Sequence, residues 1–199
     1  MKRLTAFALS AALLLTPALA AGTEEKFPAV NVYPGFADVK ENDWFYDTAR
    51  LCYEIGLMKG TDKGFEPGKT LTSAECPALA ARLREAFTGD PIPAAEPGLP
   101  WYQNYADYLM EAAQESGSSY YGSIPWDDKA LFEAPATRRD FLVFMALAAD
   151  GSEDEFSAVN EIAHEDLPDV GEDAVILRFY NWGILTGTDK YGTFAGDKT

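Results

Sequence analysis

Apolar side chains recur at helical spacing in a segment that begins near residue 44. The apolar face begins at Trp44 and continues four, seven, eight and eleven positions later, at Thr48, Leu51, Cys52 and Ile55. This is one side of a helix with 3.6 residues per turn. Gly56 follows directly, as glycine often does after the last turn of a helix. The pattern predicts a helix that ends at residue 55.

The same arrangement, an apolar helical face closed by a glycine, occurs twice more. One face consists of Tyr105, Leu109, Ala112, Ala113 and Ser116 and is followed by Gly117. The other consists of Val175, Ile176, Phe179 and Trp182 and is followed by Gly183. Both segments are therefore expected to be helices.

Two further helix starts combine a threonine with an acid three positions later. The pairs are Thr72 with Glu75 and Thr137 with Asp140. In such a capping box each side chain accepts a hydrogen bond from the backbone N–H of the other residue, and we assign these four residues that structural role. Apolar faces follow the boxes: Cys76, Leu79, Ala80 and Leu83 after the first, and Phe141, Phe144, Met145 and Ala148 after the second. Pro77 lacks an N–H and predicts a local distortion of the first of these helices.

The chain also repeats itself. Gly-Leu-Met-Lys-Gly-Thr at 56–61 returns as Gly-Ile-Leu-Thr-Gly-Thr at 183–188, and Asp38-Val39 returns as Asp169-Val170. The two capping boxes lie 65 residues apart, half of the 131 residues between the two aspartates. Two helices per period predict an all-α fold of tandem helix–loop–helix repeats. The third copy stops at Thr199 before a second capped helix, and we expect the sequence to be a fragment of a longer chain.

The first twenty residues have the features of a signal peptide. A positive start, an apolar run and the small residues Ala18-Leu19-Ala20 follow in order. The organisation we predict is a signal peptide at 1–20, an N-terminal linker at 21–33, a first copy at 34–87, a proline-rich linker at 88–100, a second copy at 101–149, an acidic connection at 150–166 and a partial third copy at 167–199.

Composition narrows the classes of function. The chain has 199 residues, of which 32 are acidic and 16 basic, so its formal charge is −16. Such a charge opposes binding to nucleic acid. A single histidine and two cysteines exclude most zinc sites, the acidic run at 150–155 does not match a calcium loop, and we expect no metal and no cofactor. We expect no transmembrane span either, because no segment after the signal peptide is apolar enough.

Two further kinds of chemistry are conceivable from the residue types, a disulfide and a pair of catalytic carboxylates. Cys52 and Cys76 form an even pair, and export permits a disulfide, but both fall on apolar faces where a free thiol is a small hydrophobe. The acid pairs Glu153 with Glu155 and Glu161 with Glu165 lie in charge runs without an aromatic cleft signal. We therefore do not predict an enzyme within these residues.

The motifs of the first copy, taken in order, resemble an S-layer homology repeat. They are Phe36-Ala37-Asp38-Val39, Asp43-Trp44-Phe45-Tyr46, Gly56-Leu57-Met58-Lys59-Gly60, Gly64-Phe65-Glu66-Pro67 and Leu71-Thr72-Ser73-Ala74-Glu75. The resemblance covers most of the chain after the signal peptide. It implies helix–loop–helix units around a pseudo-threefold axis, with the third truncated here. It also implies an exported protein held non-covalently at the cell wall by a secondary cell-wall polysaccharide, a peptidoglycan-linked glycan that often carries ketal-linked pyruvate.

The resemblance also implies binding residues where the motifs match. They are the opening aspartates Asp38 and Asp169, the opening indoles Trp44 and Trp101, and the arginine Arg138. Ser73 stands where the first copy would have the equivalent arginine. A guanidinium can bind a pyruvate carboxylate, an indole can stack on a sugar ring, and an aspartate can accept from hydroxyls. The structural alternatives are core packing for Trp44, a turn cap for Asp38 and an ordinary exposed arginine at 138.

The function predicted from the sequence is anchoring of an exported protein to the cell wall by polysaccharide binding. Two alternatives stay open. The copies could be a structural or protein-interaction module that kept the fold and lost the glycan, or they could tether a catalytic domain beyond residue 199.

Overall fold

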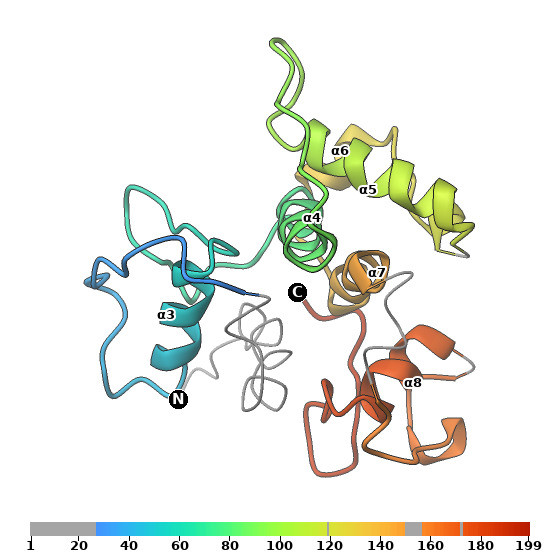
Figure 1. Ribbon diagram of the computed structural model, residues 1–199. Coiled ribbons are helices and arrows are strands. Elements are labelled where there is room, and N and C mark those ends of the chain that lie inside the picture. Colours follow the sequence, from blue (N-terminus) through green and yellow to red (C-terminus); the bar gives the residue numbers. More distant parts are fainter. Residues whose placement is uncertain (1–26, 119, 150–156, 172) are drawn as a thin grey trace. The chain divides into compact units, whose positions relative to one another are not determined.

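The computed structural model describes residues 27–118, 120–149, 157–171 and 173–199 (Figure 1). The predicted signal peptide and the acidic run at 150–155 lie outside these residues. The described part of the chain forms helices and contains no β-strand, which confirms the all-α class. The pseudo-threefold arrangement of the copies stays a prediction.

The five helices expected from periodicity and capping are all present. The helices are α3 (Tyr46–Glu54), α4 (Glu75–Thr88), α5 (Gln103–Ser116), α6 (Lys129–Glu133), α7 (Arg138–Ala149) and α8 (Ala174–Asn181), with 3-10 turns at Tyr121–Ser123 and His164–Asp166. Helix α6 was not expected, because five residues are too few to show a period. It starts at Asp128, whose carboxylate accepts from the N–H groups of Ala130 and Leu131.

The chain divides into two compact units that do not follow the copy boundaries. The first comprises the described residues up to Thr70 together with Arg82–Asp90, and the second comprises Leu71–Ala81 and the described part of Pro91–Thr199. Helix α4 thus starts in the second unit and ends in the first. The core of the first unit contains Val39, Phe45, Ala49 and Phe65, with Phe36, Tyr46 and Met58 packed against it.

Helix α7 is the centre of the second unit. It contacts both α5 and α8, and α6 lies beside α5 (Figure 1). All but one of the residues from Phe141 to Ala149 are buried. A helix that is apolar on most sides needs neighbours on most sides, and burial of these side chains is the main stabilising contribution in this unit.

A short contact closes the first helix of the first and third copies in the same way. In each copy the N–H groups of a Val-Asn pair donate to one carbonyl at the end of the helix, and the asparagine amide donates to the carbonyl before it. The bonds are from Val30 and Asn31 to Glu54 (2.7 and 3.0 Å) and Tyr53 (3.0 Å), and from Val159 and Asn160 to Asn181 (2.8 and 3.0 Å) and Tyr180 (2.8 Å). We call this the Val-Asn clasp. Its residues lie in the segments that the sequence analysis assigned to the linker and the acidic connection.

The two cysteines are buried free thiols. Burial raises the pKa of Cys52 to about 12 and raises that of Cys76 as well, so neither is a nucleophile at neutral pH. The distortion predicted at Pro77 is absent, because α4 starts at Glu75 and Pro77 falls in its first turn, where no intrahelical N–H bond is lost. In the described part of the chain no helix has the length and apolarity that a membrane crossing needs.

Candidate functional site

Asp38 holds the end of the glycine-rich loop in the first copy. Its carboxylate accepts from the N–H groups of Phe65 (3.1 Å) and Glu66 (2.7 Å). Burial of the carboxyl opposes ionisation, but the N–H groups of Glu66 and Phe65 favour the charged form, and the pKa of Asp38 lies below its usual value. Glu66 has a φ of 55°, which a residue with a side chain rarely adopts. The carboxylate therefore supports a strained turn.

Asp169 does the same in the third copy. It accepts from the N–H groups of Phe194 (2.7 Å) and Ala195 (2.6 Å), and Ala195 has a φ of 54°. Both opening aspartates are thus committed to backbone groups. Each aspartate thus caps a turn, which is the structural role that the sequence analysis gave as the alternative for Asp38. The turn lies more than twenty residues further along the chain.

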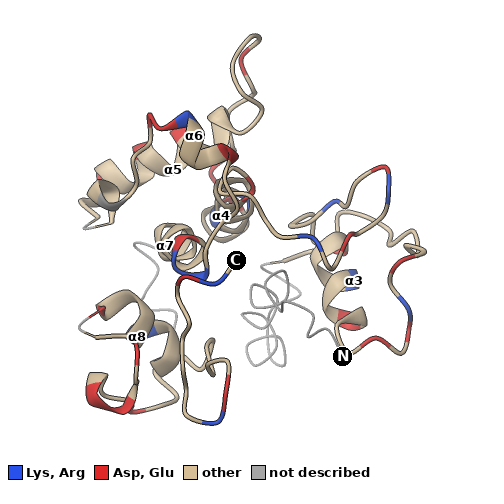
Figure 2. Cartoon of the chain, turned by 180° about the vertical axis from the view of Figure 1, so that it is seen from behind, with Lys and Arg blue, Asp and Glu red and all other residues tan. Residues whose placement is uncertain are grey.

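The structure brings Arg138 and Asp169 together around Phe194. The Nε of Arg138 donates to the carbonyl of Phe194 (2.9 Å), and its guanidinium carbon lies 5.3 Å from the centre of the Phe194 ring. Burial lowers the pKa of the guanidinium, while the nearby Tyr180 hydroxyl and Asp169 carboxylate act in the opposite direction. Helix α7 has a basic start (Figure 2), and Arg138, its first residue, is half-buried. The alternative that Arg138 is an ordinary exposed arginine is therefore wrong.

The two predicted indoles are exposed. Trp44 precedes α3 and is 65% exposed, so the core-packing alternative for it is wrong. Trp101 is 55% exposed and meets the rings of Tyr102 and Tyr105 edge-on. Trp44 belongs to the first unit and Trp101 to the second, and each is therefore described within its own unit.

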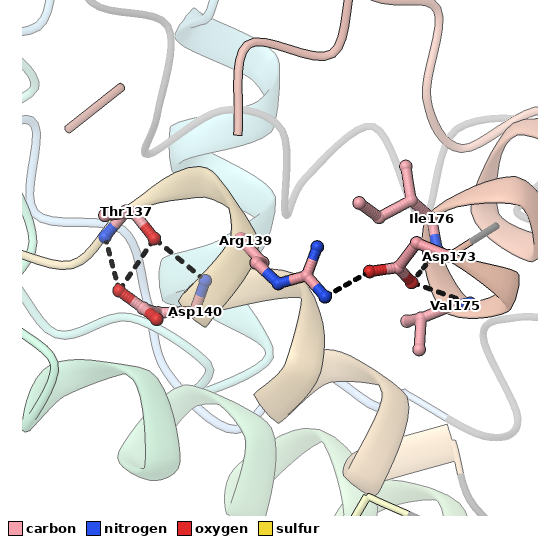
Figure 3. Close-up of polar contacts among 6 residues, drawn as sticks. All are labelled: Thr137, Arg139, Asp140, Asp173, Val175 and Ile176. Atoms are coloured by element: carbon pink, nitrogen blue, oxygen red, sulfur yellow. Dashed lines mark hydrogen bonds and ion pairs between the residues drawn. The ribbon is translucent and has the colours of Figure 1, made fainter. Parts of the chain in front are cut away.

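Thr137 and Asp140 make both backbone bonds of the expected capping box, whereas the N–H of Glu75 donates to the carbonyl of Thr72. At α7 the Asp140 carboxylate accepts from the N–H (2.9 Å) and hydroxyl (2.7 Å) of Thr137, and the N–H of Asp140 donates back to that hydroxyl (3.1 Å; Figure 3). At α4 the Glu75 carboxylate accepts from the N–H (2.8 Å) and hydroxyl (3.1 Å) of Thr72. Both helix starts are therefore occupied by side chains of their own.

The segment before α4 and the first residues of α7 are each held by backbone hydrogen bonds to the copy that follows. They are Ser73 N to Ala134 O (2.9 Å), Ala74 N to Phe132 O (2.9 Å), Ala136 N to Leu71 O (2.8 Å), Arg138 N to Lys198 O (2.9 Å) and Arg139 N to Gly196 O (3.2 Å). We call these the junction bonds. They set the positions of Ser73 and Arg139, and both residues face the same cavity.

This cavity, of about 490 Å³, lies in the second unit. It is lined by Ser73, Tyr120, Ile124, Pro125, Leu131, Arg139, Asp140, Val143, Phe144, Asp173, Ala174 and Val175. Its volume lies within the roughly 300–1,000 Å³ of small-molecule sites. Ser73 is only 2% exposed, and its hydroxyl has no hydrogen-bond partner among the described residues. The hydroxyl oxygen itself is covered, so other atoms of Ser73 form its part of the cavity wall.

One ion pair spans the cavity wall. Nη2 of Arg139 lies 2.5 Å from Oδ2 of Asp173, across the starts of α7 and α8 (Figure 3). None of Ser73, Arg139 or Asp173 was predicted as a binding residue. The signal available in the sequence was a charged residue at each of two helix starts, but only the fold shows that the two starts meet.

Residues 35–75 match the family model of the S-layer homology domain. The chain carries an S-layer homology domain. This agrees with the resemblance of the first copy, and such a domain is an anchoring module rather than a catalytic one. The match to this domain therefore supports the predicted role at the cell surface.

Parts of this chain are similar to surface-layer proteins and to an enzyme. S-layer protein sap of Bacillus anthracis is 39% identical over 70 residues, 35% of this chain and 8% of that protein. The surface-layer 125 kDa protein of Lysinibacillus sphaericus is 30% identical over 115 residues, 54% of this chain and 9% of that protein. An amylopullulanase of Thermoanaerobacterium thermosulfurigenes is 34% identical over 53 residues, 27% of this chain and 3% of that protein.

The chain spans less than a tenth of the length of these relatives. No solved structure matches it significantly. The match to the S-layer homology domain and to surface-layer proteins places the chain with exported proteins of the cell surface, as its sequence predicted.

Proposed function

We propose that this chain holds an exported protein non-covalently at the cell wall by binding secondary cell-wall polysaccharide in the cavity of the second unit. The observation that carries the proposal is a cavity of about 490 Å³ in which the charged side chains of Arg139, Asp140 and Asp173 lie among apolar ones. The S-layer homology domain supports the class of ligand.

The lining suits a sugar residue. Asp140 and Asp173 offer oxygen acceptors, and Arg139 offers N–H donors, for the hydroxyl groups of a sugar ring. Apolar side chains line the remainder of the wall and match the C–H face of a ring; they are Ile124, Pro125, Leu131, Val143, Phe144 and Val175. A few polar groups among apolar walls are typical of small-molecule sites.

The residues that the resemblance implied contribute differently in this proposal. Trp44 and Trp101 are exposed and stay candidates for stacking on further sugar rings of the polymer. Arg138, Asp38 and Asp169 are bonded to backbone groups and do not line the cavity, so in this proposal they do not contact the glycan first. The guanidinium at the cavity is that of Arg139.

An enzyme tether is the second candidate, because some relatives bear enzyme names. The amylopullulanase and an exoglucanase XynX of Acetivibrio thermocellus each share a 53-residue match with this chain. The present residues could bind the wall while a catalytic domain lies elsewhere in a longer chain. We assign no catalysis to the described residues.

Sedimentation with purified wall sacculi tests the proposal. Ala174 is exposed and lines the cavity, so the side chain of Ala174→Trp would fill the opening. We expect that about tenfold more sacculi will be needed to sediment the same fraction of this variant. Ala130→Trp is the matched control, since Ala130 is also an exposed alanine in the first turn of a helix but does not line the cavity.

Two results would contradict the proposal. One is equal sedimentation of Ala174→Trp and the unsubstituted protein, with both folded by circular dichroism. The other is undiminished binding to sacculi stripped of their secondary polymer, because the proposal makes that polymer the ligand.

A further inference from the structure

The backbone of Arg139 is held firmly, whereas its side chain is not. The N–H of Arg139 donates to the carbonyl of Gly196 (3.2 Å), which is one of the junction bonds. The side chain is 56% exposed, and its Nη2 lies 2.5 Å from Oδ2 of Asp173 (Figure 3). An ion pair with a partly exposed member contributes little to stability. The guanidinium can therefore leave Asp173 at little cost.

Asp173, in contrast, is held in place by its own helix. Its Oδ1 accepts from the N–H groups of Val175 (3.1 Å) and Ile176 (3.3 Å), which caps α8, and its side chain is only 12% exposed. The cap uses Oδ1 and the ion pair uses Oδ2, so the cap remains when Arg139 leaves. The pair thus joins a fixed carboxylate to a guanidinium on a long, partly exposed stem.

Arg139 supplies the positive charge of the cavity wall. Among the described residues that line the cavity it is the one basic side chain, and the acidic ones are Asp140 and Asp173. A guanidinium forms its strongest hydrogen bonds with a negatively charged acceptor. While Asp173 holds the guanidinium, an acceptor on a ligand has to compete with that carboxylate. Asp140 has another partner, because its Oδ2 accepts from the N–H and hydroxyl of Thr137.

We infer that Asp173 is an internal competitor of the wall polymer, which holds the Arg139 guanidinium in the free protein and gives it up when a negatively charged group of the polymer enters the cavity. The inference rests on the proposed function and adds how that site is regulated. It makes Arg139 a binding residue and Asp173 the residue that weakens binding. The resemblance implied neither role, since the arginine it pointed to is Arg138.

The cost of this competition follows from how often the pair is open. A ligand that needs the open pair binds more weakly in proportion to the fraction of molecules in which it is open. Because a partly exposed ion pair is weak, we expect this fraction to be about one fifth. Removing the competitor should therefore tighten binding about fivefold.

Sedimentation with sacculi that carry their secondary polymer measures the competition. Asp173→Asn keeps a side-chain oxygen to cap α8 and removes the charge opposite Arg139. We expect about fivefold fewer sacculi to sediment the same fraction of this variant. Asp173→Ser is a second variant, because serine also caps a helix and carries no charge, and it should show a gain in the same direction.

Arg139→Gln distinguishes competition from a general effect of charge. This change removes the guanidinium, so about tenfold more sacculi should be needed. Adding Asp173→Asn to Arg139→Gln should then alter sedimentation by less than about twofold, because no guanidinium is left to release. Asp166→Asn is the charge-matched control. It removes one negative charge at a carboxylate that accepts from the N–H of Ala163 and does not line the cavity, and it should leave sedimentation unchanged.

Several outcomes would overturn the inference and leave the proposed function standing. One is weaker or unchanged sedimentation of Asp173→Asn and Asp173→Ser, both folded by circular dichroism, because Asp173 would then support the site. Others are an equal gain in Asp166→Asn, undiminished binding by Arg139→Gln, and a gain from Asp173→Asn that persists alongside Arg139→Gln. No sedimentation of the unsubstituted protein with intact sacculi would refute both the inference and the proposed function.

Discussion

Asp38 and Asp169 show how one carboxylate can support an unfavourable backbone conformation. A residue with a side chain at positive φ costs about 1–2 kcal/mol relative to the right-handed region. In each copy the aspartate accepts from that residue and from the aromatic residue before it. The recurrence of the same contact in two copies explains why the Asp-Val pair is one of the clearest parts of the internal repeat.

The Asp38 contact makes stability depend on pH in a definite direction. Because the folded-state pKa is below its ordinary value, the charged carboxylate stabilises the fold above pH 4, and this contribution is lost as pH falls through the lowered pKa. Asp38→Asn should therefore lower the free energy of unfolding at pH 7, and the difference from the unsubstituted protein should shrink toward pH 2. Urea unfolding at several pH values measures this.

Asp62→Asn is the control, since Asp62 is an exposed acid of the same loop. It should leave unfolding unchanged at pH 7. If Asp38→Asn and Asp62→Asn behaved alike across the pH range, the support of the Glu66 turn by Asp38 would be refuted.

The helices of this chain could be predicted because their signals are local. Periodicity gave α3, α5 and α8, and the capping boxes located α4 and α7 to within three residues. The Val-Asn clasp was missed, although the same dipeptide occurs before the first helix of two copies. Its bonds join residues twenty or more positions apart, and neither periodicity nor capping rules report such a contact.

The capping box of α7 predicts a clear difference between two conservative changes. Thr137→Ala removes the hydroxyl that accepts from Asp140 and should destabilise the protein by about 1 kcal/mol. Thr137→Ser keeps that hydroxyl and should change stability by only a few tenths of that amount. Urea unfolding compares the two. Equal destabilisation by serine and alanine would show that the methyl group, and not the cap, is what matters.

At the scale of the whole molecule the net charge of −16 constrains how a wall polymer is bound. A protein that relied on overall attraction to an acidic polymer would release it as salt screens the charges. Here overall repulsion opposes binding, so raising sodium chloride from about 0.05 to about 0.5 M should leave sedimentation with sacculi unchanged or increase it. A steep loss of binding over this range would contradict a local, cavity-based mode.

The candidate site could be predicted only in part. The sequence indicated the anchoring family, because the order of the motifs carries that information, but it left open whether Trp44 is exposed or packed in the core. It did not identify the cavity, since Ser73, Arg139 and Asp173 come from three copies and meet only through the junction bonds and the packing of α7 on α8. Arg138 and Arg139 are neighbours in sequence, and only the structure shows that the first braces Phe194 while the second faces the cavity.

The junction bonds have a consequence for anyone who wishes to transplant this module. Each aspartate-held loop belongs to one copy, but the backbone groups before α4 and at the start of α7 are satisfied by the copy that follows. A single copy moved into another protein would keep its own loop and leave those donors and acceptors without partners. The transferable part is therefore a pair of neighbouring copies together with the junction bonds between them. A chimera spliced within the proline-rich linker would separate Ser73 and Ala74 from Ala134 and Phe132, and should fold less well than one that keeps the pair intact.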